Sequence, residues 1–105
     1  NFKPVISKIH DAIKNVDGRI KVGGHTDDNP ISTPEYRSNW ELSTARAVSV
    51  AHALMENGKI EENRFEIIGY GDTRPLFPNT TQENRAKNRR VDIVIHQGGE
   101  LVAGE

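Results

Sequence analysis

The stretch GHTDDNP, residues 24–30, gathers several chemically active side chains in one short segment. It holds His25, Thr26, Asp27 and Asp28 between a strand-like run and a proline. Imidazole and carboxylate groups coordinate metals, transfer protons and bind charged ligands. The segment therefore allows three kinds of site: a metal centre, an acid–base catalyst, or a clamp for a charged ligand.

Two of these kinds of site lack the partners that they need. A zinc site requires three or four convergent ligands, and only His25, Asp27 and Asp28 lie close together, with no HxxxH pair or second paired cluster. Adjacent aspartates rarely point into one cleft, and the sequence has no GxSxG elbow, cysteine nucleophile or phosphate-binding loop. We therefore expect no metal, no cofactor and no enzyme activity.

The composition indicates one soluble domain without a strongly charged partner. The chain has 105 residues, of which 34% are hydrophobic and 28% charged, with a formal net charge of −1 and no cysteine. No apolar run approaches the roughly 18 residues that a membrane span requires. The basic segment NRAKNRR, with Arg85, Lys87, Arg89 and Arg90, carries no aromatic residue and is typical of a solvated helix face. We therefore expect no nucleic-acid partner.

Hydrophobic periodicity predicts three helices that alternate with three strands. Apolar residues from Phe2 to Val16 follow one helix face, and RIKVGGH then alternates as a strand that ends at paired glycines. A second helix is expected from about Trp40 to Asn57, with its core stripe at Ala47, Val50, Ala51 and Leu54. RFEIIGYG and VDIVIHQ predict strands, separated by a short polar helix in TQENRAKNRR. This α/β order favours parallel pairing, helices on one face, and a sheet that is incomplete at an edge.

A clamp for opposite charges remains as the chemistry of GHTDDNP. Asp27 follows a strand end, and Arg46 lies on the flank of the next helix near its start. A carboxylate can bind an ammonium group, and a guanidinium can bind a carboxylate through paired hydrogen bonds. Leu42, outside the core stripe and one turn earlier, offers an apolar wall between them. The alternative is an internal Asp27–Arg46 salt bridge that ties the loop to the helix in a structural assembly module.

Four segments together resemble a known family. GHTDD, NWELSTARAVSV, FEIIGYGDTRPLFPN and ENRAKNRRVDIVI are similar, in order and spacing, to the OmpA-like peptidoglycan-binding domain. The resemblance covers about residues 2–97, so we expect one domain at 1–97 and a flexible tail at 98–105. The long loop between Asp27 and Leu42, together with SNWELS, is most similar to the C-terminal domain of MotB/PomB-type flagellar stator proteins.

The resemblance implies a fold and a function. The fold is a two-layer α/β sandwich with a mixed sheet and helices on one face, in which the family's first strand is missing. The function is non-catalytic binding of peptidoglycan, through its diaminopimelate stem peptide and the adjoining sugar, to anchor a stator to the cell wall. The alternative is an outer-membrane or lipoprotein-type peptidoglycan anchor. The expected location is the periplasm, in an inner-membrane protein whose anchor lies outside this chain. The expected partners are a second copy of the protein and an ion-channel subunit reached through segments absent here.

The resemblance also assigns roles to individual residues. Asp27 matches the acidic residue expected to meet the ammonium group of diaminopimelate, and Arg46 matches the arginine expected to bind its carboxylate. Leu42 matches a ligand contact one turn before that arginine, and Arg89 matches an arginine near the sugar. Weaker matches are Thr26, Asp28 and Ser49.

Overall fold

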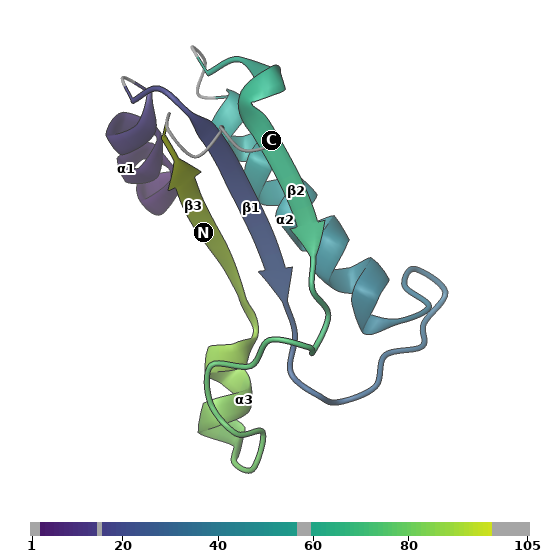
Figure 1. Cartoon of the computed structure of the whole chain (residues 1–105). Coiled ribbons are helices and arrows are strands. Elements are labelled where there is room, and N and C mark those ends of the chain that lie inside the picture. Colours follow the sequence, from purple (N-terminus) through teal and green to yellow (C-terminus); the bar gives the residue numbers. More distant parts are fainter. Residues whose placement is uncertain (1–2, 15, 57–59, 98–105) are drawn as a thin grey trace.

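A computed structural model describes residues 3–14, 16–56 and 60–97. Helices and strands alternate in two layers, with α1 and α2 on one face of a sheet (Figure 1). The elements in chain order are α1 (Lys3–Ile13), β1 (Arg19–His25), α2 (Asn39–Glu56), the 3-10 helix η1 (Glu62–Arg64), β2 (Phe65–Gly69), α3 (Gln82–Asn88) and β3 (Arg90–His96). The two-layer α/β fold expected from the sequence is confirmed, and the tail expected at 98–105 lies outside the described residues.

The sheet has the order β2-β1-β3 and mixed pairing. β1 runs parallel to β2, with Ile20 opposite Phe65, and antiparallel to β3, with Ile20 opposite Ile95. The mixed sheet implied by the resemblance is confirmed, whereas the parallel pairing expected from the order of elements holds for β2 and is wrong for β3. The reason is that α3 lies beyond the end of the sheet at which β2 finishes, so the chain enters β3 from that end and runs back (Figure 1). Among the described strands β3 pairs with β1 alone, so its other edge is open.

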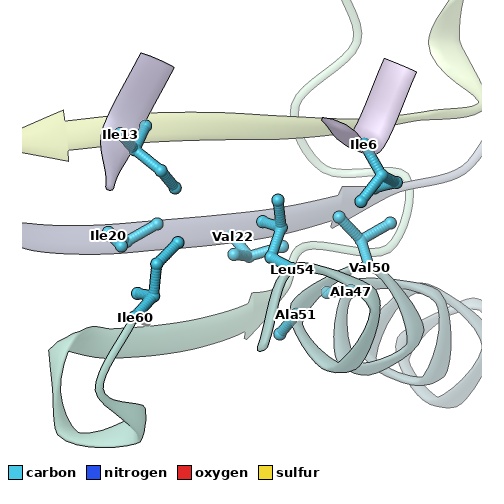
Figure 2. Close-up of a cluster of buried hydrophobic side chains, with 9 residues drawn as sticks. All are labelled: Ile6, Ile13, Ile20, Val22, Ala47, Val50, Ala51, Leu54 and Ile60. Carbon is cyan, nitrogen blue, oxygen red and sulfur yellow. The ribbon is translucent and has the colours of Figure 1, made fainter. Parts of the chain in front are cut away.

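The hydrophobic core lies between the sheet and the helices α1 and α2. Figure 2 shows side chains from α1 and α2 meeting those of β1. The buried hydrophobic residues are Ile6, Ile13, Ile20, Val22, Ala47, Val50, Ala51, Leu54 and Ile60. All four residues of the stripe predicted for the second helix are among them, because residues at helical spacing share one face that packs on the sheet.

Close approach of α2 to the sheet depends on two glycines. A Cβ atom at Gly24 of β1 would collide with the carbonyl group of Ser43, and one at Gly69 of β2 with the hydroxyl of Thr44. Both strands therefore pass directly under the first turns of α2 at the end where the GHTDD segment begins. Gly24, the second of the paired glycines in the sequence, accordingly serves helix packing as well as the strand end.

Three details differ from the sequence-based expectation. α1 ends at Ile13 rather than near Val16, and the chain then turns at Gly18 with a φ of +125°. Trp40, expected at the edge of the core, is 55% exposed, and Val5 is 58% exposed although it lies on the apolar face of α1.

Among the described residues, no helix combines the length and the apolar character that crossing a membrane requires.

Candidate ligand-binding site

Hydrogen bonds between two loops fix the backbone that carries the GHTDD side chains. The carbonyl of Gly24 accepts from the N–H of Tyr70 at 2.9 Å, and the N–H of Thr26 donates to the carbonyl of Gly71 at 2.9 Å. The N–H of Gly71 donates in turn to Oγ of Ser43, a fully buried residue of α2, at 2.9 Å. These bonds extend the pairing of β1 and β2 beyond the strands and hold the following loop against the start of α2. Thr26, a weaker candidate from the sequence, is buried, and its hydroxyl donates to the carbonyl of Asp27 at 2.8 Å.

The carboxylate of Asp27 is buried and has two donors. Its side chain is 9% exposed. Oδ1 accepts from the N–H of Asn29 at 3.0 Å, and Oδ2 accepts from Nη1 of Arg89 at 2.6 Å. Arg89 is the C-cap residue of α3, and its side chain is 43% exposed. The internal Asp27–Arg46 salt bridge considered as an alternative is therefore wrong, because the carboxylate points to the end of α3 and is neutralised there.

Asp28 forms a parallel contact with the same helix. Its Oδ1 lies 3.3 Å from Nε of Arg85, whose Nη2 also donates to the carbonyl of Asn79 at 2.8 Å. Arg85 and Arg89 are four positions apart, which places them on one face of a helix. Two adjacent aspartates thus meet two arginines one turn apart. Asp28, a weaker ligand-binding candidate from the sequence, ties the loop to α3.

The prediction that the basic segment NRAKNRR is a purely solvated helix face is therefore wrong. In addition to these two pairs, Nε of Arg90 lies 3.1 Å from a carboxylate oxygen of Asp92. Lys87 lies over the ring of Phe77, with 5.0 Å between its Nζ and the ring centroid. Each arginine of NRAKNRR therefore has a carboxylate partner inside the chain.

Arg46 lies at a cavity that also includes Arg89. The cavity has a volume of about 530 Å³. Its polar wall is formed by Arg46 and Ser49 of α2 together with Arg89 and Arg90, and its apolar wall by residues of α1, α2 and β3. The apolar lining residues are Val5, Ile6, Ile9, Val50, Val91 and Ile93. The structure thus brings Arg46, Ser49 and Arg89 together and connects Asp27 to them through its ion pair. Leu42 is half-buried one turn before Arg46 and is not among the lining residues.

The three arginines that line this cavity differ in whether they form ion pairs inside the protein. Arg89 is paired with Asp27, and Arg90 with Asp92. Arg46 is exposed, and within the part of the chain that the structure describes its guanidinium forms neither an ion pair nor a hydrogen bond. A free guanidinium beside an apolar wall is suited to binding a carboxylate that is attached to an aliphatic chain.

His25 belongs to a different polar cluster. Its Nε2 lies 3.1 Å from Oδ2 of Asp92, and its ring stacks on Tyr70 with 4.9 Å between centroids. Burial lowers the pKa of His25, as does the nearby positive charge of Arg90, whereas Asp92 opposes this shift. Arg74 covers the Tyr70 ring at 4.6 Å. His25, Asp27 and Asp28 therefore have three different partners, and among residues 3–14, 16–56 and 60–97 no three histidine, aspartate or glutamate side chains form a metal-binding group.

Asn88 is a site-forming residue that the sequence did not indicate. Its side chain is fully buried and makes four hydrogen bonds. Oδ1 accepts from the N–H groups of Leu76 and Phe77, and Nδ2 donates to the carbonyl of Phe77 and to Oδ1 of Asn79. These bonds fasten the preceding loop to the last turn of α3 and so fix the start of the segment that carries Arg89. An asparagine within a polar helix gives no sequence signal for such a role.

Comparisons with known proteins identify the family and the fold of the chain. The profile of the OmpA family matches residues 2–89. The chain is 43% identical over 86 residues to Motility protein B of Bacillus subtilis, and 34% identical over 93 residues to the Peptidoglycan-binding protein ArfA of Mycobacterium tuberculosis. These matches cover 82% and 88% of the chain, respectively. The solved structure of the cell wall anchor of the T6SS from Pseudomonas aeruginosa superimposes with a TM-score of 0.81 and 44% identity over 90% of the chain.

The matched regions are parts of larger proteins. The chain spans 33% of the Bacillus subtilis protein, 27% of the Mycobacterium tuberculosis protein and 65% of the Pseudomonas aeruginosa chain. The similarity therefore describes one domain of each relative. A profile match over most of the chain, identities above 30% and a shared fold lead to one conclusion: the chain belongs to the OmpA family and is homologous to a domain of Motility protein B.

Proposed function

We propose that this chain is a non-catalytic module that binds peptidoglycan and anchors a flagellar motor stator to the cell wall. The observation that carries the proposal is Arg46, an exposed guanidinium on the wall of a cavity that is also lined by Arg89, the ion-pair partner of Asp27. Homology to Motility protein B and to a protein named for peptidoglycan binding supports it. The names of these relatives refer to motility and wall binding rather than to a reaction, which supports a binding role.

The proposed ligand is the diaminopimelate residue of the stem peptide. The far end of its side chain carries an ammonium group and a carboxylate on an aliphatic chain. Arg46 would bind the carboxylate, Asp27 the ammonium group, and Leu42 the methylene groups between them. Arg89 would contact the adjoining sugar, and Ser49, exposed on α2 beside Arg46, would contribute a hydroxyl.

The larger assembly follows from the stator homology. We propose that the complete protein is a homodimer, works with an ion-channel subunit, and exposes this domain to the periplasm of a bacterium. A wall anchor for another envelope machine is the second candidate, because the Pseudomonas aeruginosa relative is a cell wall anchor of the T6SS. Loss of swimming with normal flagella on disruption of the wall-binding residues would favour the stator. Normal swimming would favour the other anchor.

Sedimentation with purified sacculi tests the binding function. Arg46→Ala removes the proposed carboxylate contact, and a charge-assisted pair of hydrogen bonds contributes about 1.5–3 kcal/mol, so affinity should fall by about 10- to 100-fold. Arg37→Gln is the matched control, because Arg37 is an 86% exposed arginine that pairs with Glu41 and does not line the cavity. If Arg46→Ala, like Arg37→Gln, sediments with the sacculi to the same extent as the wild type, the proposed site is wrong.

A further inference from the structure

Asp27, the acidic residue of the proposed site, already has hydrogen-bond donors inside the protein when no ligand is bound. Both carboxylate oxygens of Asp27 have donors, Oδ1 the backbone N–H of Asn29 and Oδ2 the Nη1 of Arg89. The contact with Arg89 is 2.6 Å long, just below the range of about 2.7–2.9 Å that is usual for charge-assisted N–H···O hydrogen bonds. With only 9% of the side chain exposed, a second cation cannot approach Oδ2 while the guanidinium of Arg89 remains there.

Movement of the Arg89 guanidinium away from Asp27, with no other cation in its place, would leave the buried carboxylate of Asp27 without a compensating charge. Such a carboxylate is strongly unfavourable, because burial takes away the water that would solvate it. An ammonium group that arrives from a ligand restores the compensation. The favourable event at Asp27 is therefore the replacement of one cation by another rather than the addition of a cation to a free carboxylate.

Arg89 is the arginine of its segment that can leave most easily. Its side chain is 43% exposed, and within the described residues Asp27 is its one side-chain partner. Arg85 and Arg90, by contrast, each hold a carboxylate and at least one backbone carbonyl, with side chains 27% and 16% exposed. Arg89 also lines the cavity that contains Arg46, so its released guanidinium would remain beside the ligand.

We propose that Arg89 competes with the ligand's ammonium group for Asp27 and thereby weakens the binding of ligands that carry this group. This inference rests on the proposed function. A ligand that carries a carboxylate alone can contact Arg46, but it has no cation with which to replace Arg89. A ligand with both charges exchanges its ammonium group for the guanidinium. Arg89 thus lowers the affinity for ligands that carry an ammonium group and leaves the affinity for ligands that carry a carboxylate alone unchanged.

The test compares two peptides and measures their affinities by calorimetry on the 105-residue chain. One is L-Ala-γ-D-Glu-meso-diaminopimelate. The other contains 2-aminopimelate in its place and so lacks the side-chain ammonium group. Arg89→Gln should raise the affinity for the first peptide by about ten-fold, because the ammonium group then meets an uncompensated carboxylate. The affinity for the second peptide should stay within about two-fold.

Two further variants separate exchange from a general change in structure. Arg89→Lys keeps a cation but loses the planar fork, so its affinity for the diaminopimelate peptide should lie between those of the wild type and Arg89→Gln. Arg37→Gln should change neither affinity. Circular dichroism reports whether each variant is folded. If Arg89→Gln does not fold, the affinity of Arg89→Lys for the diaminopimelate peptide tests the competition, because this variant retains a partner for Asp27.

The outcomes distinguish this inference from the proposed function. If Arg89 variants bind both peptides more weakly, Arg89 is a direct ligand contact and the competition is refuted, while the peptidoglycan-binding function stands. An unchanged affinity for the diaminopimelate peptide also refutes the competition. If the wild type binds neither peptide nor sacculi, the proposed function fails and the inference fails with it.

Discussion

Arg89 and Asp27, 62 positions apart in the chain, form an ion pair with 2.6 Å between Nη1 and Oδ2. The pair joins the loop after β1 to the end of α3, and Asp28 with Arg85 joins the same two segments one helical turn away. Two acidic residues and two basic residues thus connect the GHTDD and NRAKNRR segments. This contact joins the two segments, whereas Arg46 on α2 forms no ion pair with any of the residues that the structure describes.

The Asp27–Arg89 pair should contribute measurably to stability. In a double-mutant cycle of Asp27→Asn and Arg89→Gln, each single change should lower the free energy of unfolding, and the double change should cost less than their sum. The coupling should be about 1 kcal/mol, limited by the partial exposure of Arg89. Urea unfolding followed by circular dichroism measures it. The exposed Arg37–Glu41 pair is the comparison and should couple by less than about 0.5 kcal/mol. Strict additivity at Asp27 and Arg89 would contradict the pairing.

Asn88 should be among the polar residues most sensitive to substitution. Asn88→Ala removes four hydrogen bonds and leaves two backbone N–H groups and one carbonyl without that partner, so we expect a loss of about 2–4 kcal/mol. Asn88→Asp keeps the acceptor for the N–H groups but turns a carboxylate oxygen towards the Phe77 carbonyl and should also destabilise. The exposed Asn63 serves as the control, with Asn63→Ala expected to change stability by less than about 0.5 kcal/mol. Thermal unfolding measures the two losses. Equal losses of stability in Asn88→Ala and Asn63→Ala would contradict the role assigned to the Asn88 hydrogen bonds.

The sequence predicted those features that depend on local spacing. The stripe of α2 from Ala47 to Leu54 was correct because a helix repeats every 3.6 residues regardless of its neighbours. Arg46 was indicated by its position on the flank of the second helix and by the resemblance, Arg89 by the resemblance alone, and the structure brings both to one cavity. Their roles in ligand binding remain predictions. Asp27 illustrates the limit of local information, because its ion-pair partner depends on where α3 packs.

The direction of β3 and the role of Asn88 could not be predicted for a related reason. An alternation of helices and strands does not reveal that α3 has only seven residues and lies past the end of the sheet, where it cannot act as a crossover. The four bonds of Asn88 go to a loop whose course is itself a result of folding. In both cases the information is tertiary and has no period in the sequence.

The stability should fall on acidification through the titration of His25. Burial and Arg90 lower its pKa from the ordinary 6.5, so the unfolded chain binds a proton at a higher pH than the folded one. The contribution of neutral His25 to stability is therefore complete above about pH 6.5 and is lost as the pH falls through the folded pKa. His25→Gln should reduce the slope of unfolding free energy against pH below pH 6.5, as measured by urea titrations. His52→Gln, at an exposed position of α2, should leave the slope unchanged. Equal slopes for His25→Gln and the wild type would contradict this assignment.

Neighbouring glycines of β1 should respond differently to the same substitution, because they face opposite sides of the sheet. A Cβ at Gly24 would collide with the backbone of Ser43 in α2, which cannot move without displacing the helix. Gly24→Ala should therefore destabilise by about 1–3 kcal/mol and weaken sacculus binding, since α2 carries Arg46. A Cβ at Gly23 would meet the Tyr70 ring at 2.8 Å, and a side chain can shift at lower cost. Thermal unfolding of both variants measures the difference. A loss at Gly23→Ala as large as that at Gly24→Ala would show that Tyr70, rather than the distance between β1 and α2, limits the packing.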